Sequence, residues 1–289
     1  SVGSQANRIE PLFGRGEYAG LVPQVVIKAG EKEVNLLEAG HRAADAIVRC
    51  SALQDELRAA FRGVLAGDSE PLARLAPTSL VFGAWDSRDT QAKLPRLITS
   101  TIRAFNVRRL SRSAQYVPAV PYVEEGLLDE PADKKMKDSY AERGFVHVPS
   151  SATAGGVIAI GGIRRDASLH LAALRLLAAG ADAQKTLALR RYILGLALTA
   201  FTCSPSGYLR QGCNLVLDSK KPREFVEVHG DGRRTPAAVT HEGALNFAQE
   251  AGRAFGVGEP RSVEFDREKA KQDLTDEKKQ RKARAKKTA

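Results

Sequence analysis

The chain has 289 residues, 43% of them hydrophobic, which is enough for a full core and ordinary for a globular protein. No apolar run reaches the ~18 residues that a membrane-spanning helix needs, and the first residues lack the basic and then apolar pattern of a secretion signal. Three cysteines without C-x-x-C spacing favour reduced thiols, so we expect a cytoplasmic protein with no membrane segment.

The net charge of +10 is unevenly distributed. Residues 267–289 hold ten Lys/Arg and four Asp/Glu, whereas the other 266 residues carry a net charge of only +4. A basic run of this kind is usually a solvated helix or a disordered tail. Because the body is not globally basic, any nucleic-acid site in it must be a local stripe.

The first quarter of the chain predicts one strand and two helices. A strand is expected over residues 21–28. Asn35 can cap a helix that runs to about residue 49, and a second helix is expected over about 52–65. A proline at each end of residues 71–77 indicates a connector.

Residues 79–116 are the most informative stretch. The apolar run at 80–83 predicts a buried strand, which releases the chain into a polar loop. A helix is expected to begin near residues 93–95, because Leu94, Leu97, Ile98, Ile102 and Phe105 recur at helical spacing. A basic, polar run follows, and residues 106–155 are weakly patterned. A long insertion of this type in a compact domain is usually functional or disordered.

The remainder alternates between short strands and helices. Strands are expected over residues 155–163 (buried), 213–217, 223–228 and 262–265, and helices over about 168–179, 185–201 and 241–255. A Gly/Pro/Ser loop spans 202–212, and a tight turn is expected at 230–232. This order favours an open α+β sandwich of the βαββαβ ferredoxin or RRM type, formed by a single domain over residues 1–266, with a helical or disordered tail at 267–289.

No catalytic motif stands out. The five histidines are isolated, zinc-ligand spacing, a P-loop and a G-x-S-x-G elbow are absent, and we predict neither a metal nor a cofactor. Asp86 and Asp89 are possible Mg²⁺ ligands, but aspartates just before a helix more often cap it.

Four local clusters suggest nucleic-acid binding. They lie at the end of the first strand with the following helix, at the start of the helix near residue 93, in the basic run at 108–116 (which also contains Gln115), and at residues 164–165 with the 202–212 loop. The candidate RNA contacts are Lys28, Arg42, Arg88, Lys93, Arg96, Arg108, Arg109, Arg112, Tyr116, Arg164, Arg165, Tyr208, Arg210 and Gln211. Any one of them is equally compatible with ordinary surface charge, and Arg42 has an i,i+4 partner in Glu38. Because no RNP1 run is present, the pattern indicates a sequence-tolerant binder of the RNA backbone.

The blocks at residues 8–48 and 79–116 resemble the backbone subunit of the type I-U (also called I-G) CRISPR Cascade, a member of the RAMP superfamily. The resemblance implies an RRM-like palm with helical insertions and a thumb-like insertion, for which about 106–155 is the candidate. It implies copies stacked head-to-tail along a CRISPR RNA, which presents the guide for pairing with target DNA in antiviral defence.

The resemblance also implies partners and the absence of an active site. Other Cascade subunits would contact the chain, and a recruited helicase-nuclease would cut the DNA. Two alternatives stay open. One is a RAMP endoribonuclease, which would use a histidine base on precursor RNA or a loop aspartate (Asp86, Asp89 or Asp166) with a metal on target RNA. The other is a protein-only interaction module with solubilising basic patches.

Overall fold

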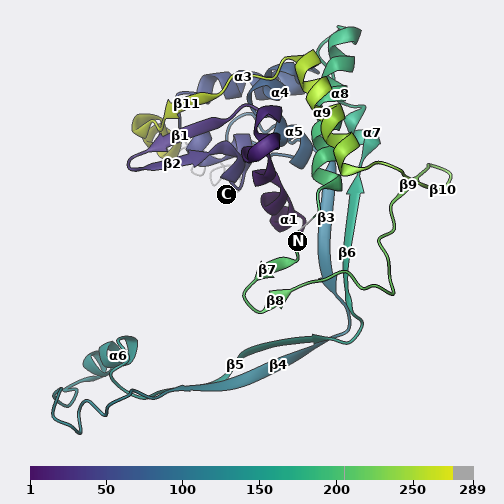
Figure 1. The fold of residues 1–289 in the computed structure, drawn as a ribbon. Helices are drawn as coiled ribbons and strands as arrows, with labels where there is room; N and C mark the ends of the chain where they lie inside the picture. The colour runs from purple at the N-terminus through teal and green to yellow at the C-terminus, as the bar shows by residue number, and fades with distance from the viewer. Residues whose placement is uncertain (205, 276–289) are drawn as a thin grey trace, which may run out of the picture. The chain divides into compact units, whose positions relative to one another are not determined.

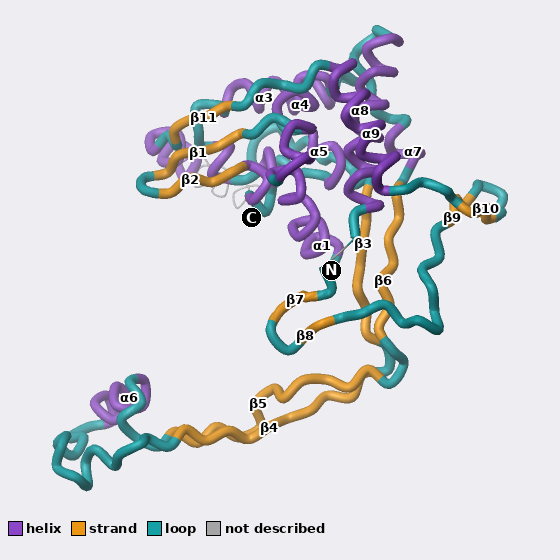
Figure 2. The backbone as a smooth tube through the Cα atoms, in the orientation of Figure 1, coloured by secondary structure: helices purple, strands orange, loops and turns teal. Residues whose placement is uncertain are grey.

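The computed structural model describes residues 1–204 and 206–275, and it is a mixed α+β protein, as the sequence predicts (Figures 1 and 2). Its contacts divide the chain into two units. The core unit comprises Ser1–Thr101 and Asp166–Ala289, and the hairpin unit is Ile102–Arg165. The tail is helical over residues 267–275, and residues 276–289 lie outside the described part.

A three-stranded sheet lies in the core unit. β1 (Val25–Ala29) is central and pairs in parallel with β11 (Arg261–Glu264) and in antiparallel with β2 (Lys32–Asn35). Val25 and Ile27 are fully buried, and the residues between and after them are more exposed, which is the alternation of a strand with one covered face. The strands expected at 21–28 and 262–265 are thus confirmed in shorter or shifted form, whereas β2 was not predicted.

The helices of the core unit supply most of its interior. They are α1 (Val2–Ile9), α2 (Ala46–Arg49), α3 (Gln54–Leu65), α4 (Glu70–Leu75), α5 (Pro77–Phe82), α7 (Leu171–Leu174), α8 (Ala183–Thr202) and α9 (His241–Phe255), with 3-10 turns η1 (Glu10–Gly14), η2 (Gly16–Leu21), η3 (Leu36–Glu38) and η4 (Arg42–Ala44). The predictions near α3, α8 and α9 are confirmed.

Helices α8 and α9 pack side by side (Figure 1). A glycine allows the close approach, because a Cβ on Gly195 would lie 2.6 Å from the Cα of Ala248. The Tyr192 ring stacks on Phe255 at 4.8 Å, and its hydroxyl donates to the Leu21 carbonyl at 2.8 Å. Burial raises the pKa of this hydroxyl, so it stays protonated and remains a donor.

The single helix expected over 35–49 is wrong, and the structure breaks it into three short turns. Asn35 does act as a cap, since its side chain accepts from the Leu37 amide, but the turn that it caps ends at Glu38. Gly40 follows, and Arg42 adopts a φ of 57°, a left-handed conformation that interrupts any continuous α-helix.

Three further predictions around residues 70–105 are also wrong. The expected connector at 71–77 is largely α4, and the expected strand at 80–83 is the end of α5, because a short apolar run does not distinguish a buried helix from a strand. The helix expected from residue 93 is replaced by β3 (Ile98–Ala104). Its β-branched sequence Ile-Thr-Ser-Thr-Ile suits a strand and outweighs the helical spacing of its apolar residues.

The hairpin unit contains a long two-stranded ribbon (Figure 2). β4 (Val107–Tyr116) pairs in antiparallel with β5 (Val148–Ala159), and α6 (Lys134–Glu142) lies in the connection between them. The prediction that residues 155–163 are buried is wrong, because Val157, Ile158 and Ile160 are 59%, 48% and 61% exposed. A ribbon of only two strands has no further layer to bury the side chains on its faces.

The remaining strands form small ladders. β3 pairs with β6 (Ile163–Leu169), β7 (Tyr208–Arg210) with β8 (Cys213–Asn214), and β9 (Val226–Val228) with β10 (Arg234–Pro236). The turn at 230–232 is confirmed between β9 and β10. The helix expected at 168–179 is reduced to α7, and the strand expected at 213–217 to two residues. The cysteines are free thiols, and among the described residues no helix has the length and apolarity to cross a bilayer.

Candidate nucleic-acid interface

Arg42 belongs to the interior of the core unit. Its side chain is only 4% exposed, and its Nε lies 2.6 Å from Oε2 of Glu10. Its two terminal nitrogens donate to the Gly83 carbonyl at 3.2 Å and to Oδ1 of Asn7 at 3.1 Å. Both sequence-based interpretations of Arg42 are therefore corrected. It is not placed to grip RNA, and its ion-pair partner is Glu10 and not Glu38.

The environment of this pair is unusual for a carboxylate. Burial raises the pKa of Glu10 from 4.5 to about 7, although the Arg42 charge acts in the opposite direction. Burial likewise lowers the pKa of Arg42, opposed by Glu10. Oε1 of Glu10 is buried and has no hydrogen-bond partner within the described part of the chain. The pair thus connects η1 to η4 at a considerable desolvation cost.

Lys28 and His41, which the sequence groups with Arg42, are both exposed. Lys28 lies on β1 opposite Glu33 and Glu264, so acidic residues flank it on both neighbouring strands. The His41 side chain is 85% exposed, with Nδ1 3.4 Å from Oδ2 of Asp45. These two residues show the features of ordinary surface charge.

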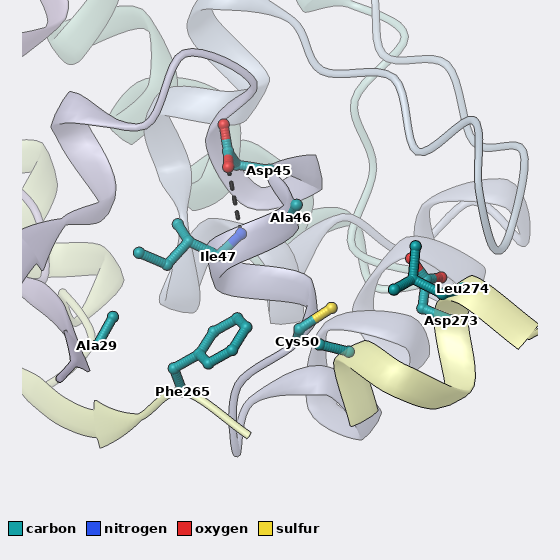
Figure 3. Close-up of a pocket in the computed structure, with 9 residues that line it drawn as sticks. Ala29, Asp45, Ala46, Ile47, Cys50, Phe265, Asp273 and Leu274 are labelled. Carbon is teal, nitrogen blue, oxygen red and sulfur yellow. Dashed lines mark hydrogen bonds between the residues drawn. The ribbon is translucent and has the colours of Figure 1, made fainter. Parts of the chain in front are cut away.

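A cavity of about 540 Å³ lies in the core unit, next to Asp45 (Figure 3). Alkyl and aromatic groups such as Ile47 and Phe265 dominate its wall, and the Asp45 side chain is engaged by the Ile47 amide. Burial raises the pKa of the Cys50 thiol at its edge, which keeps this sulfur protonated and weakly nucleophilic. The cavity is therefore lined mainly by apolar groups.

The second predicted cluster lies in the loop between α5 and β3. Arg88, Lys93 and Arg96 are exposed there. Arg96 is fixed by a hydrogen bond from Nε to the Phe82 carbonyl at 3.2 Å, and Nζ of Lys93 lies 5.8 Å from the centre of the Trp85 ring. These cations therefore lie on an ordered loop of the core unit, at positions open to solvent.

The aspartates of this loop are used in folding it. Asp86 is buried and accepts from the amide and the hydroxyl of Thr90 at 2.8 and 2.6 Å, while Asp89 pairs with Arg58. We expected these aspartates to cap a helix, and this prediction is wrong because β3 follows the loop. Asp86 instead closes a turn. Among the described residues no group of three or more His, Cys, Asp or Glu side chains is arranged to hold a metal ion.

The third cluster lies on the ribbon of the hairpin unit. Arg108 is paired with Ile158, Arg109 with Val157, and Arg112 with Thr153. Since side chains alternate along a strand, Arg108 and Arg109 point to opposite faces, and all three arginines are exposed.

A glycine pair shapes this ribbon. The register shifts between Leu110 and Ser111, where Gly155 and Gly156 lie on the other strand. Gly156 has a φ of 123°, and a Cβ on Gly155 would lie 3.0 Å from the Ser111 backbone, so both positions need glycine. The resulting bulge lies beside the segment that carries the three arginines.

Tyr116 ends β4 and is 52% exposed. Its ring lies against the backbone of Gly144, where an added Cβ would come within 3.1 Å of the hydroxyl oxygen. The side chain of Gln115 is outside the described part of the structure. Tyr116 therefore offers one partly covered aromatic face at the end of the arginine-bearing strand.

The fourth predicted cluster is divided between the two units. Arg164 and Arg165 belong to the hairpin unit, where the Arg164 guanidinium lies 5.1 Å from the centre of the Phe105 ring. Tyr208, Arg210 and Gln211 are exposed on the β7–β8 hairpin of the core unit, which Arg8 holds through the Leu209 carbonyl.

Sequence reasoning missed two features of these surfaces. One is the exposure of Trp85, and the other is the exposed apolar side chains that lie between the arginines of the ribbon, such as Leu110 and Val157. The signal for the first was present, because a tryptophan in a polar loop between cationic residues is rarely a core residue. The second had none, since apolar runs in strands are normally buried.

Residues 1–109, from α1 to the start of β4, match the family described as CRISPR-associated protein GSU0053 (Cas_GSU0053). The match covers 109 of the 289 residues and agrees with the resemblance seen in the sequence. No curated protein matches it.

Proposed function

We propose that the chain is a non-catalytic CRISPR RNA-binding backbone subunit, which polymerises head-to-tail along the guide RNA in a cytoplasmic type I-U (I-G) Cascade. It presents the guide for pairing with target DNA, beside other Cascade subunits and a recruited helicase-nuclease. In this proposal the core unit is built around an RRM-like palm, and the hairpin unit is the thumb-like insertion.

The observation that carries the proposal is the arginine-bearing ribbon. Arg108, Arg109 and Arg112 lie within five residues of one strand and are exposed, with cationic side chains on both faces. Several phosphate contacts must add up to give useful affinity, since each contributes only ~0.7 to the salt slope on a single strand. A ribbon with charge on both faces suits a binder that follows a polyanion without reading its sequence.

The engagement of the loop aspartates supports a role without catalysis. Oδ2 of the buried Asp86 accepts from Thr90, and Asp89 is paired with Arg58, so both carboxylates take part in holding the loop. For the histidine branch of the endoribonuclease alternative the candidate base is His41, which is exposed beside Asp45. A carboxylate in that position can orient an imidazole, so His41 is the residue to test.

Binding and cleavage can be tested with the same purified protein. Fluorescence anisotropy with a labelled CRISPR RNA over a salt series should give nanomolar to micromolar binding at low salt and a steep salt dependence. RNA that co-purifies with the chain and its operon products should contain CRISPR spacers. Absence of RNA affinity at low salt would favour the protein-only interaction module.

The cleavage arm uses labelled repeat RNA and complementary target RNA, with and without Mg²⁺. We expect no discrete products. Products that disappear in His41→Ala or Asp86→Asn, with binding retained, would replace the proposal by the endoribonuclease. Circular dichroism of Asp86→Asn is needed in parallel, because this side chain also closes the turn to Thr90.

A further inference from the structure

Trp85 is the single tryptophan of the chain, and its side chain is largely in solvent. It is 59% exposed, whereas tryptophans are on average well buried because of their large apolar surface. An exposed indole of this size leaves a large aromatic face available for contact with a ligand.

The loop holds Trp85 in this exposed position. Trp85 and Lys93 form an antiparallel bridge, the Asp86 amide donates to the Ala92 carbonyl at 2.9 Å, and the Leu94 amide donates to the Ala84 carbonyl at 2.8 Å. The Asp86 carboxylate fastens the tip through Thr90. The indole is therefore presented by a preorganised turn, which lowers the entropy lost on binding.

The base of the loop is anchored in the core unit. Leu94 and Leu97 are buried, and Gly83 has a φ of 77°. A Cβ on Gly83 would lie 2.7 Å from Cγ of Arg96 and 3.0 Å from the Leu94 carbonyl oxygen. Glycine is thus needed for the two ends of the loop to approach each other, and this approach holds Arg96 beside the same surface.

The charges around the indole favour an anion. Lys93 lies 5.8 Å from the ring centre, and Lys93 and Arg96 are exposed. The two carboxylates of the loop do not offset them at the surface, because Asp86 is buried and Asp89 is paired with Arg58. A flat aromatic face bordered by cations is the combination that binds a single nucleic-acid strand by stacking and phosphate contacts.

We propose that Trp85 is a stacking platform for one base of a single-stranded RNA, with Lys93 and Arg96 on the neighbouring phosphates. This inference rests on the proposed RNA-binding function and adds a site outside the arginine ribbon. A protein partner is the less favoured occupant, because Trp85 is the one large hydrophobic side chain exposed within residues 83–97, all of which the structure describes. Stacking accepts any base, in keeping with a sequence-tolerant binder.

The single tryptophan makes the test direct. Titration of the full chain with oligouridylate at low salt should quench the indole fluorescence in parallel with the anisotropy of a labelled copy of the same RNA. Trp85→Ala should weaken binding about tenfold with an unchanged salt slope, because stacking releases no counterion, and Trp85→Phe should retain most of the affinity. Lys93→Ala should lower the slope by about 0.7.

Leu65→Ala is the matched control, since Leu65 is 62% exposed and lies on α3, outside the Trp85 loop. RNA binding by anisotropy without indole quenching, or with Trp85→Ala equal to the parent, would overturn the platform and leave the proposed function standing. Indole changes that follow protein concentration without RNA would assign Trp85 to a protein contact. Absence of RNA binding altogether would overturn both proposals.

Discussion

The core unit and the hairpin unit use arginine in opposite ways. In the core unit, Arg42 is buried and contacts Glu10, Asn7 and Gly83. In the hairpin unit, Arg108 and Arg109 lie exposed on a ribbon that has no buried face at that position. The residue type is the same, but only the second group is accessible to a phosphate.

This contrast separates arginines that stabilise the fold from arginines that are exposed to a ligand. A buried guanidinium must keep its partners, because an unpaired charge in the interior is costly. An exposed one keeps its hydration and contributes little to the free energy of unfolding. Substitutions should therefore affect stability in one unit and RNA affinity in the other.

The largest expected effect is the removal of the buried cation. Arg42→Ala should lower the free energy of unfolding by about 3–5 kcal/mol, because it leaves Glu10 buried without its partner. Urea unfolding followed by circular dichroism measures this loss. The double variant Arg42→Met with Glu10→Leu removes both charges and should recover a large part of it. A stable Arg42→Ala protein with strongly reduced RNA affinity would instead return Arg42 to the interface.

The next effect concerns pH. The pKa of Glu10 is about 7 in the folded chain against an ordinary 4.5, so the folded state binds this proton more tightly than the unfolded state. The resulting stabilisation is fully present below about pH 4.5 and is lost as the pH rises through 7. Its size is on the order of 3 kcal/mol.

Glu10→Gln isolates this contribution from those of other groups. The difference in the free energy of unfolding between parent and variant, measured from pH 4.5 to 8, should change in favour of the variant as the pH rises. A difference independent of pH would mean that Arg42 keeps Glu10 ionised throughout this range.

A smaller effect is expected at the base of the Trp85 loop. Gly83→Ala should cost at least about 2 kcal/mol, because alanine must adopt a φ of 77° and also meet Arg96 and the Leu94 carbonyl. Gly67→Ala is the matched control, with a φ of 85° and open space around the added Cβ, and should cost about 1 kcal/mol. Equal losses of stability would show that the close approach to Arg96 is readily relieved.

Elements with a regular periodicity over many residues were predicted well from the sequence. Helices α8 and α9 are 20 and 15 residues long, so their patterns were distinct from those of strands. Over the six residues of α5 the apolar run was ambiguous. In β3, a helical spacing of apolar residues coincided with β-branched residues that favour a strand, and the tertiary pairing with β6 decided the outcome.

The candidate site was less predictable, for a physical reason. Exposure depends on contacts between residues distant in sequence, such as Glu10 with Arg42, and no local pattern contains them. The cationic positions of the ribbon could be named from composition, but Arg42 could not be separated from them. The exposure of Trp85 also depends on its bridge to Lys93 and on the burial of the adjacent Asp86.

The smallest effect on stability, and the sharpest test of the comparison, lies on the ribbon. Arg108→Ala and Arg112→Ala should each change the free energy of unfolding by less than about 0.5 kcal/mol, because exposed side chains contribute little to folding. Each should weaken RNA binding and lower the salt slope by about 0.7, the release expected for one lost phosphate contact. Arg210→Ala on the β7–β8 hairpin should behave in the same way.

Arg253→Ala on α9 controls for the loss of one exposed positive charge outside these clusters, and its slope should equal that of the parent. If Arg108→Ala and Arg253→Ala reduce the slope equally, the ribbon acts only through net charge and makes no specific phosphate contact. If Arg108→Ala and Arg109→Ala differ, only one face of the ribbon contacts RNA, since the two side chains point to opposite sides. The salt slopes of these variants therefore show which face of the ribbon contacts the RNA strand.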